Sequence, residues 1–114
     1  MGMAKAHSSP DFLPGTLDML ILKTLTRGTN HGYGIAQTIQ QTSEDALKIG
    51  EGSLYPALQR LLIDGYVLAE WGLSDNNRKA RFYRLTAKGR KQLAAELEHW
   101  ARIAAGINRV LVHA

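Results

Sequence analysis

Half of the chain's basic residues lie in one segment that contains no acid. Seven of the fourteen Lys and Arg residues fall between Arg78 and Lys91. The aromatic pair Phe82-Tyr83 stands between two arginines there, and this alternation favours a β-strand. A strand with a basic outward face is typical of a surface that binds a polyanion such as nucleic acid. A solvated face without a partner is the alternative explanation.

The sequence offers little that would serve an enzyme. The chain has no cysteine, which excludes disulfides, thiolate metal sites and cysteine nucleophiles. Its four histidines are scattered, and the motifs of zinc peptidases, serine hydrolases and phosphate-binding loops are missing. Glu96 and His99 have a spacing that could share a metal ion, but a solvated ion pair fits it better. We therefore predict no catalytic residues, no metal site and no cofactor.

Length and charge limit the class of protein further. The 114 residues are 45% hydrophobic and carry a formal net charge of +4, which suits one mildly basic folded domain. The longest unbroken apolar run, Met19 to Leu22, is too short to span a bilayer or to act as a signal peptide. We expect a soluble, cytoplasmic protein without a membrane partner.

The hydrophobic spacing then predicts the elements that position the basic segment. Gly and Pro residues mark the expected ends of elements, and the spacing of apolar residues between them distinguishes helices from strands. The predicted elements are a helix from Thr16 to about Gly28, a second from His31 to Thr42, a third over about 53–64, a β-hairpin over 66–85 and a last helix after Thr86. This order is mainly α with a small β-hairpin and predicts a winged helix-turn-helix followed by a long C-terminal dimerisation helix. Residues 1–12 are interpreted as a disordered lead, residues 13–85 as the DNA-binding domain and residues 86–114 as the dimerisation helix.

The third helix has two unlike sides. Leu54, Leu58, Leu61 and Leu62 form an apolar stripe, and the opposite side is available to a DNA groove. There Arg60 can read guanine and Gln59 can read adenine. The full set of predicted DNA-contacting residues is Tyr33 at the start of the second helix, Ser53, Tyr55, Pro56, Gln59 and Arg60 on the third, and Asn77, Arg78, Lys79 and Arg81 in the wing. The wing residues are expected mainly to anchor phosphate.

Apolar residues recur along the last helix at spacings of four and three. This heptad pattern predicts pairing with a second helix along its length, whereas packing on its own domain is the alternative. Because the first helix also has a second apolar side, we predict a homodimer whose interface comprises Met19, Leu22, Leu93, Leu97, Ala104, Ile107 and Leu111.

Four segments resemble one known family. The segment 52–61, GSLYPALQRL, resembles the recognition helix of PadR-family transcriptional regulators, and the resemblance continues in order through 17–22 (LDMLIL), 32–35 (GYGI) and 81–89 (RFYRLTAKG). It implies a winged helix with a single C-terminal dimerisation helix, as in the short subgroup of that family, and a role that is usually repression. Asp75 departs from the usual wing because it places an acid close to Arg78 and Lys79.

Trp100 falls within the heptad pattern and has two interpretations. It is either a large core residue of the dimer interface or a stacking platform for a flat aromatic ligand, since its neighbours Ala101, Ala104, Ala105 and Gly106 are small. The resemblance supports the second, because some similar family members bind planar drugs or phenolic compounds at such an interface.

Together these features predict a sequence-specific, homodimeric DNA-binding regulator. It would be a repressor of a double-stranded, inverted-repeat operator, released by a small planar aromatic or hydrophobic effector that contacts Trp100. The alternative is a dimeric protein-interaction adaptor without functional DNA binding, and salt-sensitive binding to DNA would separate the two.

Overall fold

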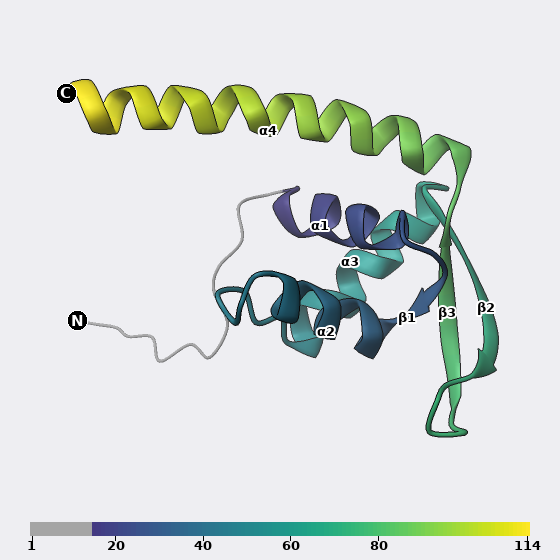
Figure 1. The fold of residues 1–114 in the computed structure, drawn as a ribbon. Helices are drawn as coiled ribbons and strands as arrows, with labels where there is room; N and C mark the ends of the chain where they lie inside the picture. Colours follow the sequence, from purple (N-terminus) through teal and green to yellow (C-terminus); the bar gives the residue numbers. More distant parts are fainter. Residues whose placement is uncertain (1–14) are drawn as a thin grey trace.

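The computed structural model describes residues 15–114, so the predicted lead over 1–12 lies outside the described residues. The chain order is α1 (Thr16–Leu25), β1 (Asn30–His31), α2 (Gly32–Thr42), α3 (Glu51–Ile63), β2 (Val67–Leu73), β3 (Lys79–Leu85) and α4 (Ala87–His113). Three helices and a small sheet form a compact body, and α4 runs across it and beyond it (Figure 1). The predicted fold class, a winged helix-turn-helix with a long C-terminal helix, is confirmed.

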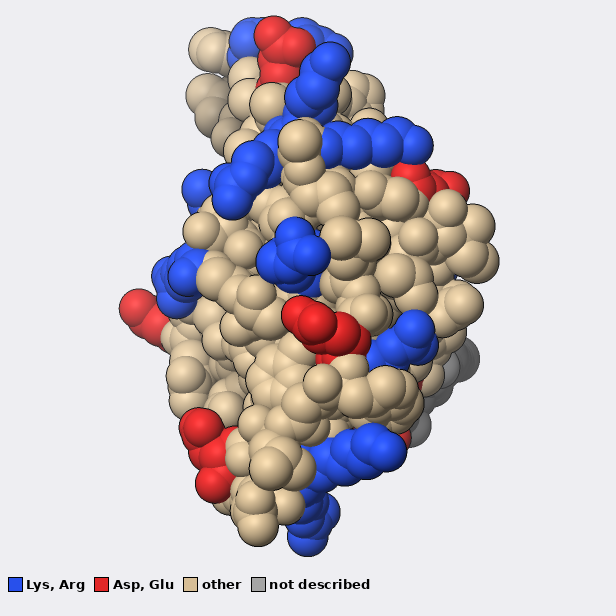
Figure 2. Space-filling view, turned by 90° about the vertical axis from the view of Figure 1, so that its right-hand side faces the viewer, with Lys and Arg blue, Asp and Glu red and all other residues tan. Residues whose placement is uncertain are grey.

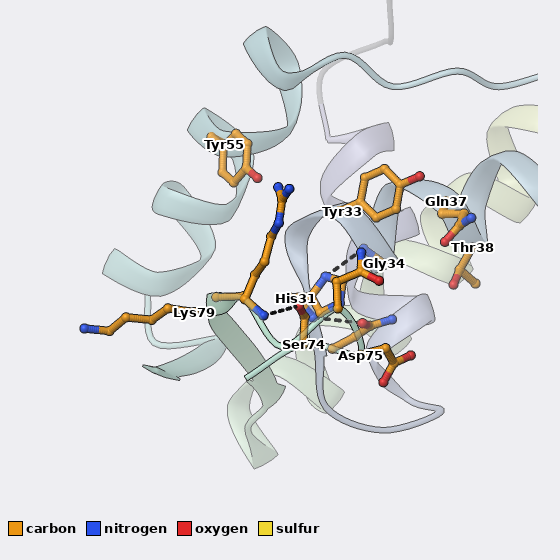
Figure 3. A pocket seen from close by; sticks show the side chains of 13 residues that line it. His31, Tyr33, Gly34, Gln37, Thr38, Tyr55, Ser74, Asp75 and Lys79 are labelled. Carbon is orange, nitrogen blue, oxygen red and sulfur yellow. Dashed lines mark hydrogen bonds between the residues drawn. The ribbon is translucent and has the colours of Figure 1, made fainter. Parts of the chain in front are cut away.

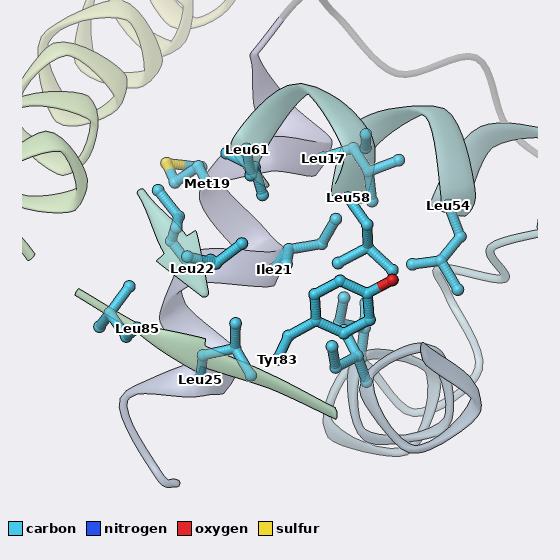
Figure 4. Packing of buried hydrophobic residues seen from close by; sticks show 14 of the residues in the cluster. Leu17, Met19, Ile21, Leu22, Leu25, Leu54, Leu58, Leu61, Tyr83 and Leu85 are labelled. Carbon is cyan, nitrogen blue, oxygen red and sulfur yellow. The ribbon is translucent and has the colours of Figure 1, made fainter. Parts of the chain in front are cut away.

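The core is built around α1, which is apolar on more than one side. Ile21 and Leu22 are fully buried, and α1 contacts α2, α3, β3 and α4 (Figure 4). The second apolar side of α1 is therefore covered within the same chain, by α4. This corrects the prediction for Leu22, which has no exposed surface to offer a second copy, and for Met19, which is only 7% exposed.

The sheet has three strands rather than the two of the predicted hairpin. Strands β2 and β3 pair in antiparallel register from Val67 opposite Leu85 to Leu73 opposite Lys79, and β1 pairs with the other edge of β3. Strand β1 is only two residues long, which is too short for its sequence to predict a strand or its pairing with β3. It ties the start of α2 to the wing.

The first turns of α4 are fixed to the body at Thr86. Its hydroxyl accepts a hydrogen bond from the Gly89 N–H at 3.0 Å, which makes Thr86 the N-cap of α4, and donates to the Gly65 carbonyl at 2.8 Å. A side chain at Gly89 would collide with the Tyr66 carbonyl, so only glycine allows this close approach. Leu93 follows as a buried core residue, 5% exposed. This corrects its assignment to a dimer interface.

The outer half of α4 extends beyond the body formed by the other described elements (Figure 1). Helix α1 has 10 residues and α4 has 27, which at 1.5 Å per residue correspond to about 15 and 40 Å. In this outer half the large apolar residues of α4 are exposed, from Leu97 at 39% to Leu111 at 75%, and Ala104 is half-buried. None of the helices within residues 15–114 is long and apolar enough to cross a membrane.

Candidate DNA-binding surface

Helix α3 presents its polar side to solvent because its apolar side is fixed in the core. Leu54, Leu58 and Leu61 are buried as predicted, and Ala57 completes the stripe where Leu62 is only half-buried. The helix begins at Glu51, two residues before the predicted start. The outward side carries the predicted base-contacting residues, all of them exposed: Ser53, Tyr55, Pro56, Gln59 and Arg60.

Arg60 is already engaged within the chain. Its guanidinium donates to the Asp18 carboxylate at 2.8 Å, which ties the last turn of α3 to the first turn of α1. The arginine side chain remains 57% exposed, whereas that of Asp18 is 18% exposed. To read a guanine with both arms of its fork, Arg60 would have to leave Asp18. The two residues are far apart in sequence, and no local spacing predicts their pairing.

His31 organises the start of α2. Its Nδ1 accepts a hydrogen bond from the Gly34 N–H at 3.0 Å, and its ring meets Phe82 of β3 edge-on at 5.2 Å. The Gly34 N–H is thus already paired and is not free to bind a DNA phosphate. Tyr33, in the same turn, points into solvent and is 69% exposed.

The turn at the end of the wing is closed by its own backbone. The Asn77 N–H donates to the Ser74 carbonyl at 2.8 Å, and Asn77 has a φ of 60°. Left-handed backbone of this kind is tolerated by Asn better than by most residues. Neither of the two ion pairs within residues 15–114 involves Asp75, so Arg78 and Lys79 are not neutralised by it.

Two clefts separate the wing from the helices. The larger, of about 770 Å³, lies between α2 and the wing, with Tyr33 and Tyr55 at its rim (Figure 3). The predicted residues that line it are Tyr33, Tyr55, Arg78 and Lys79. A neighbouring cleft of about 450 Å³ adds Gln59 and Arg81. Ser53, Pro56, Arg60 and Asn77 line neither of these two clefts.

Sequence reasoning missed several residues of these clefts. They are His31, Gln37, Thr38, Ser74 and Asn76 in the larger and Trp71 in the smaller. For Gln37 a signal was present, since it follows Tyr33 by one helical turn and shares its face. For His31 the signal was weaker, because a histidine before a glycine-rich helix start identifies neither the cap nor the cleft.

The electrostatics of this region are less uniform than the basic segment suggests. Figure 2 shows the side formed by β2, β3 and the first turns of α4, where Lys and Arg lie at several places with acidic side chains between them.

Burial raises the pKa of the Tyr83 phenol, although the nearby Arg81 opposes this. Tyr83 is therefore neutral at physiological pH. Glu96 and His99 form no ion pair, and among residues 15–114 no cluster of metal-ligating side chains occurs.

Comparisons with known proteins agree with this geometry. Residues 21–95 match the model of the transcriptional regulator PadR-like family. The chain belongs to the PadR-like family. A transcriptional regulator from Clostridium thermocellum is 30% identical with a TM-score of 0.76, over 83% of this chain and 92% of that one. A PadR family transcriptional regulator from Eggerthella lenta is 27% identical with a TM-score of 0.73, over 88% and 85%.

Two curated proteins also match this PadR-like chain. "Uncharacterized protein X" of Lysinibacillus sphaericus is 30% identical over 93 residues, 82% of this chain and 85% of that protein. A 37.1 kDa protein in a transposon of Streptomyces fradiae is 39% identical over 85 residues, 75% of this chain but only 23% of that protein. The family model that matches residues 21–95 confirms the predicted family, and with it a role in DNA-binding regulation rather than catalysis.

The PadR-like chain carries a second exposed surface on α4. We define the α4 stripe as the apolar residues that lie along one side of its outer half: Leu97, Trp100, Ile103, Ala104, Ile107, Val110 and Leu111. Ile103 and Val110 were not predicted and widen the heptad pattern. Trp100 lies within the stripe and is 41% exposed in a single chain. The outer half of α4 and the turn of the wing between β2 and β3 lie toward opposite ends of the molecule (Figure 1).

Proposed function

We propose that this PadR-like regulator is a homodimeric repressor that binds an inverted-repeat operator in duplex DNA and is released by a small planar aromatic effector. The observation that carries the proposal is the exposure of one continuous apolar stripe on a helix that projects away from its own core. A contiguous apolar surface of this kind marks an interaction site. A second copy of the same stripe is its natural partner, because two-fold symmetry brings identical surfaces together.

Dimerisation through α4 sets the form of the operator. Each protomer of a two-fold dimer carries one α3, so the two recognition helices face the DNA in opposite directions. Each reads a half-site, and half-sites of an inverted repeat lie about one helical turn, roughly 34 Å, apart. A dimer that occupies such a site prevents other proteins from binding the same DNA, and this is how a repressor acts.

The residues of the DNA surface divide by role. Gln59 and Tyr55 on the exposed side of α3 are suited to base edges, with Ser53 and Pro56 beside them. Arg78, Lys79 and Arg81 of the wing, with Asn77 in its turn, are suited to the backbone phosphates. Arg60 joins the base-reading group when it exchanges the Asp18 carboxylate for a guanine.

Trp100 supplies the effector site in this proposal. Two indoles, one from each protomer, would face one another across the two-fold axis with the small residue Ala104 one helical turn away. A flat ring could then stack between them. Entry of a ligand changes the angle between protomers and with it the distance between the two copies of α3.

The experiment that tests this function starts from a random pool of duplex DNA. The purified protein should retain sequences with an inverted repeat, and the complex should weaken steeply as salt rises. Light scattering of the free protein at micromolar concentration should give twice the chain mass of 12.6 kDa. Binding without salt dependence, or with no shared repeat among the retained sequences, contradicts the proposal.

A further inference from the structure

Trp71 is an exposed aromatic residue on the wing, and the family motifs quoted above do not include it. It lies on β2 and is 65% exposed. A single exposed apolar residue needs no explanation by itself. The surroundings of this ring are what distinguish it from Leu68, which is 47% exposed on the same strand.

The strand register places Trp71 on the inner face of the wing. Trp71 is paired with Arg81, and Val67, earlier on the same face, is paired with Leu85. Because side chains alternate along a strand, residues two apart share a face. Val67 and Leu85 are buried in the core. Trp71 therefore continues the core-facing side of the sheet beyond the end of the core, toward α2 and α3.

Across the smaller cleft, Trp71 faces the recognition helix. The cleft is lined by Tyr55 and Gln59 of α3 as well as by Trp71 and Arg81 of the wing. The ring thus lies on the same opening as residues proposed to contact DNA. Leu68, at an odd number of residues from Trp71, lies on the opposite face of the strand.

Two cations accompany the ring. The Lys79 ammonium lies 5.3 Å from the centre of the Trp71 ring, within the range of a cation–π interaction, and Arg81 is the direct cross-strand neighbour. This contact holds the long lysine side chain over an aromatic plate. A flat apolar surface flanked by positive charges matches the edge of a DNA strand, where a deoxyribose lies between two phosphates.

We propose that Trp71 packs against a deoxyribose of the DNA backbone while Lys79 and Arg81 bind the phosphates on either side of it. The proposal rests on the DNA-binding function proposed above and adds an apolar contact to it. Since every nucleotide of a duplex carries the same sugar, this contact is independent of base sequence. Bases of a duplex remain stacked and paired in this arrangement, so no base is extruded.

Affinity measurements on three variants test the contact. Trp71→Ala should bind a labelled duplex about five- to tenfold more weakly, on preferred and random sequences alike, because an apolar contact is lost. Trp71→Phe should retain most of the affinity, and Leu68→Ala, the matched change on the opposite face, should retain all of it. Both alanine variants should unfold at the same temperature as the unmodified protein, which shows that their fold is intact.

Salt dependence and fluorescence give two independent readouts. The slope of log affinity against log salt should be unchanged in Trp71→Phe but smaller by about one in Lys79→Ala, since only the lysine displaces a counterion. In a Trp100→Phe background, Trp71 is the one tryptophan left, and its emission should shift or be quenched as duplex DNA saturates the protein.

The outcomes separate this inference from the function on which it rests. If the unmodified protein binds DNA while Trp71→Ala binds equally well, or while the Trp71 emission stays constant at saturation, the sugar contact is wrong and DNA binding stands. If the unmodified protein binds no duplex at any salt concentration, both proposals are overturned.

Discussion

The outer half of α4 and the clefts beside the wing are both exposed to solvent, but their chemistry is opposite. The α4 stripe consists of aliphatic and aromatic side chains, with no charged residue among the seven that define it. The clefts are lined by tyrosines, amides, hydroxyls, Asp75 and the cations Arg78 and Lys79, which form no ion pair within residues 15–114. An apolar surface gains most from a partner that removes it from water, whereas unpaired cations gain most from a polyanion. One chain thus presents two surfaces that suit partners of different chemistry.

The largest loss of function is expected when a charge is placed in the α4 stripe. Ile107→Glu, at a position that is 48% exposed in one chain, should dissociate the dimer because a buried carboxylate would have no partner. Operator binding should fall by about 10²-fold or more, because each half-site then binds alone. Leu97→Glu, closer to the core, should dissociate the dimer and also lower the stability of the chain.

A matched control separates the stripe from α4 as a whole. At 3.6 residues per turn, Ala105 lies on the opposite side of the helix from the stripe. Ala105→Glu should therefore remain dimeric and bind DNA normally. Light scattering measures the mass of each variant, and a mass of 12.6 kDa for the unmodified protein at micromolar concentration would contradict the dimer.

The next largest effects are expected on α3. Gln59→Ala and Arg60→Ala should each weaken binding to the preferred site by roughly 1–3 kcal/mol while hardly changing binding to random DNA. Arg60 also stabilises the fold through Asp18, so the variant Asp18→Asn is needed beside it. That change removes the ion pair and keeps the guanidinium. Affinities for preferred and random duplexes, measured by anisotropy, check these expectations.

The pattern of the two variants identifies the role of Arg60. If Arg60 reads a base, only Arg60→Ala lowers the ratio of specific to non-specific affinity. If Arg60 serves the fold alone, both variants lower the unfolding temperature equally and the ratio stays intact. A surface ion pair contributes about 0–1 kcal/mol, so the loss of stability itself should be small.

A ligand bound at Trp100 in the α4 stripe should weaken DNA binding at the other surface, by less than a charge in the stripe does. Planar aromatic compounds that stack on Trp100 should shift its emission and weaken operator binding about tenfold, which requires a preference of about 1.4 kcal/mol for the free dimer. Trp100→Ala should abolish both responses and leave DNA affinity unchanged without the compound. The emission is measured without DNA in a Trp71→Phe background. A broad panel of aromatics that gives no Trp100-dependent signal would reduce Trp100 to a packing residue.

The α4 helix shows what sequence spacing predicts and where it stops. Leu93 and Leu97 are consecutive positions of the same apolar repeat, yet Leu93 is 5% and Leu97 39% exposed in one chain. The spacing correctly predicts which side of the helix is apolar. It does not tell whether the cover comes from the same chain or from another, because that depends on how far α1 reaches along α4.

The candidate site shows the same division. The apolar stripe of α3 was predictable from local spacing, and the polar side follows from it. The Asp18–Arg60 pair, the pairing of β1 with β3 and the approach of Trp71 to Tyr55 all join segments far apart in sequence. Contacts of this kind depend on the assembled fold, so no local pattern of residues predicts them.

Removal of single wing cations should have a modest and uniform effect. Arg78→Ala and Lys79→Ala should each weaken binding to all duplexes by about three- to fivefold and reduce the salt slope by about one for each lost phosphate contact. Arg102→Ala is the matched control, because this arginine lies on α4 beside Glu98, 3.8 Å away, and far from the wing. A loss confined to one sequence would contradict a backbone role for the wing.

The smallest expected effect is a gain. Asp75 lines the larger cleft with Arg78 and forms no ion pair within the described residues, so its charge faces the path proposed for the DNA backbone. Asp75→Asn should tighten binding to every duplex by about twofold at low salt, because one repulsion at a distance of several ångströms is weak in water. The gain should vanish as salt rises, since screening removes the same repulsion. Asp45→Asn is the matched control, because Asp45 is an exposed acid in the loop after α2 that lines neither wing cleft. Equal gains from both variants would mean that net charge matters rather than the position of Asp75, and unchanged affinity in Asp75→Asn would place the backbone away from the turn of the wing.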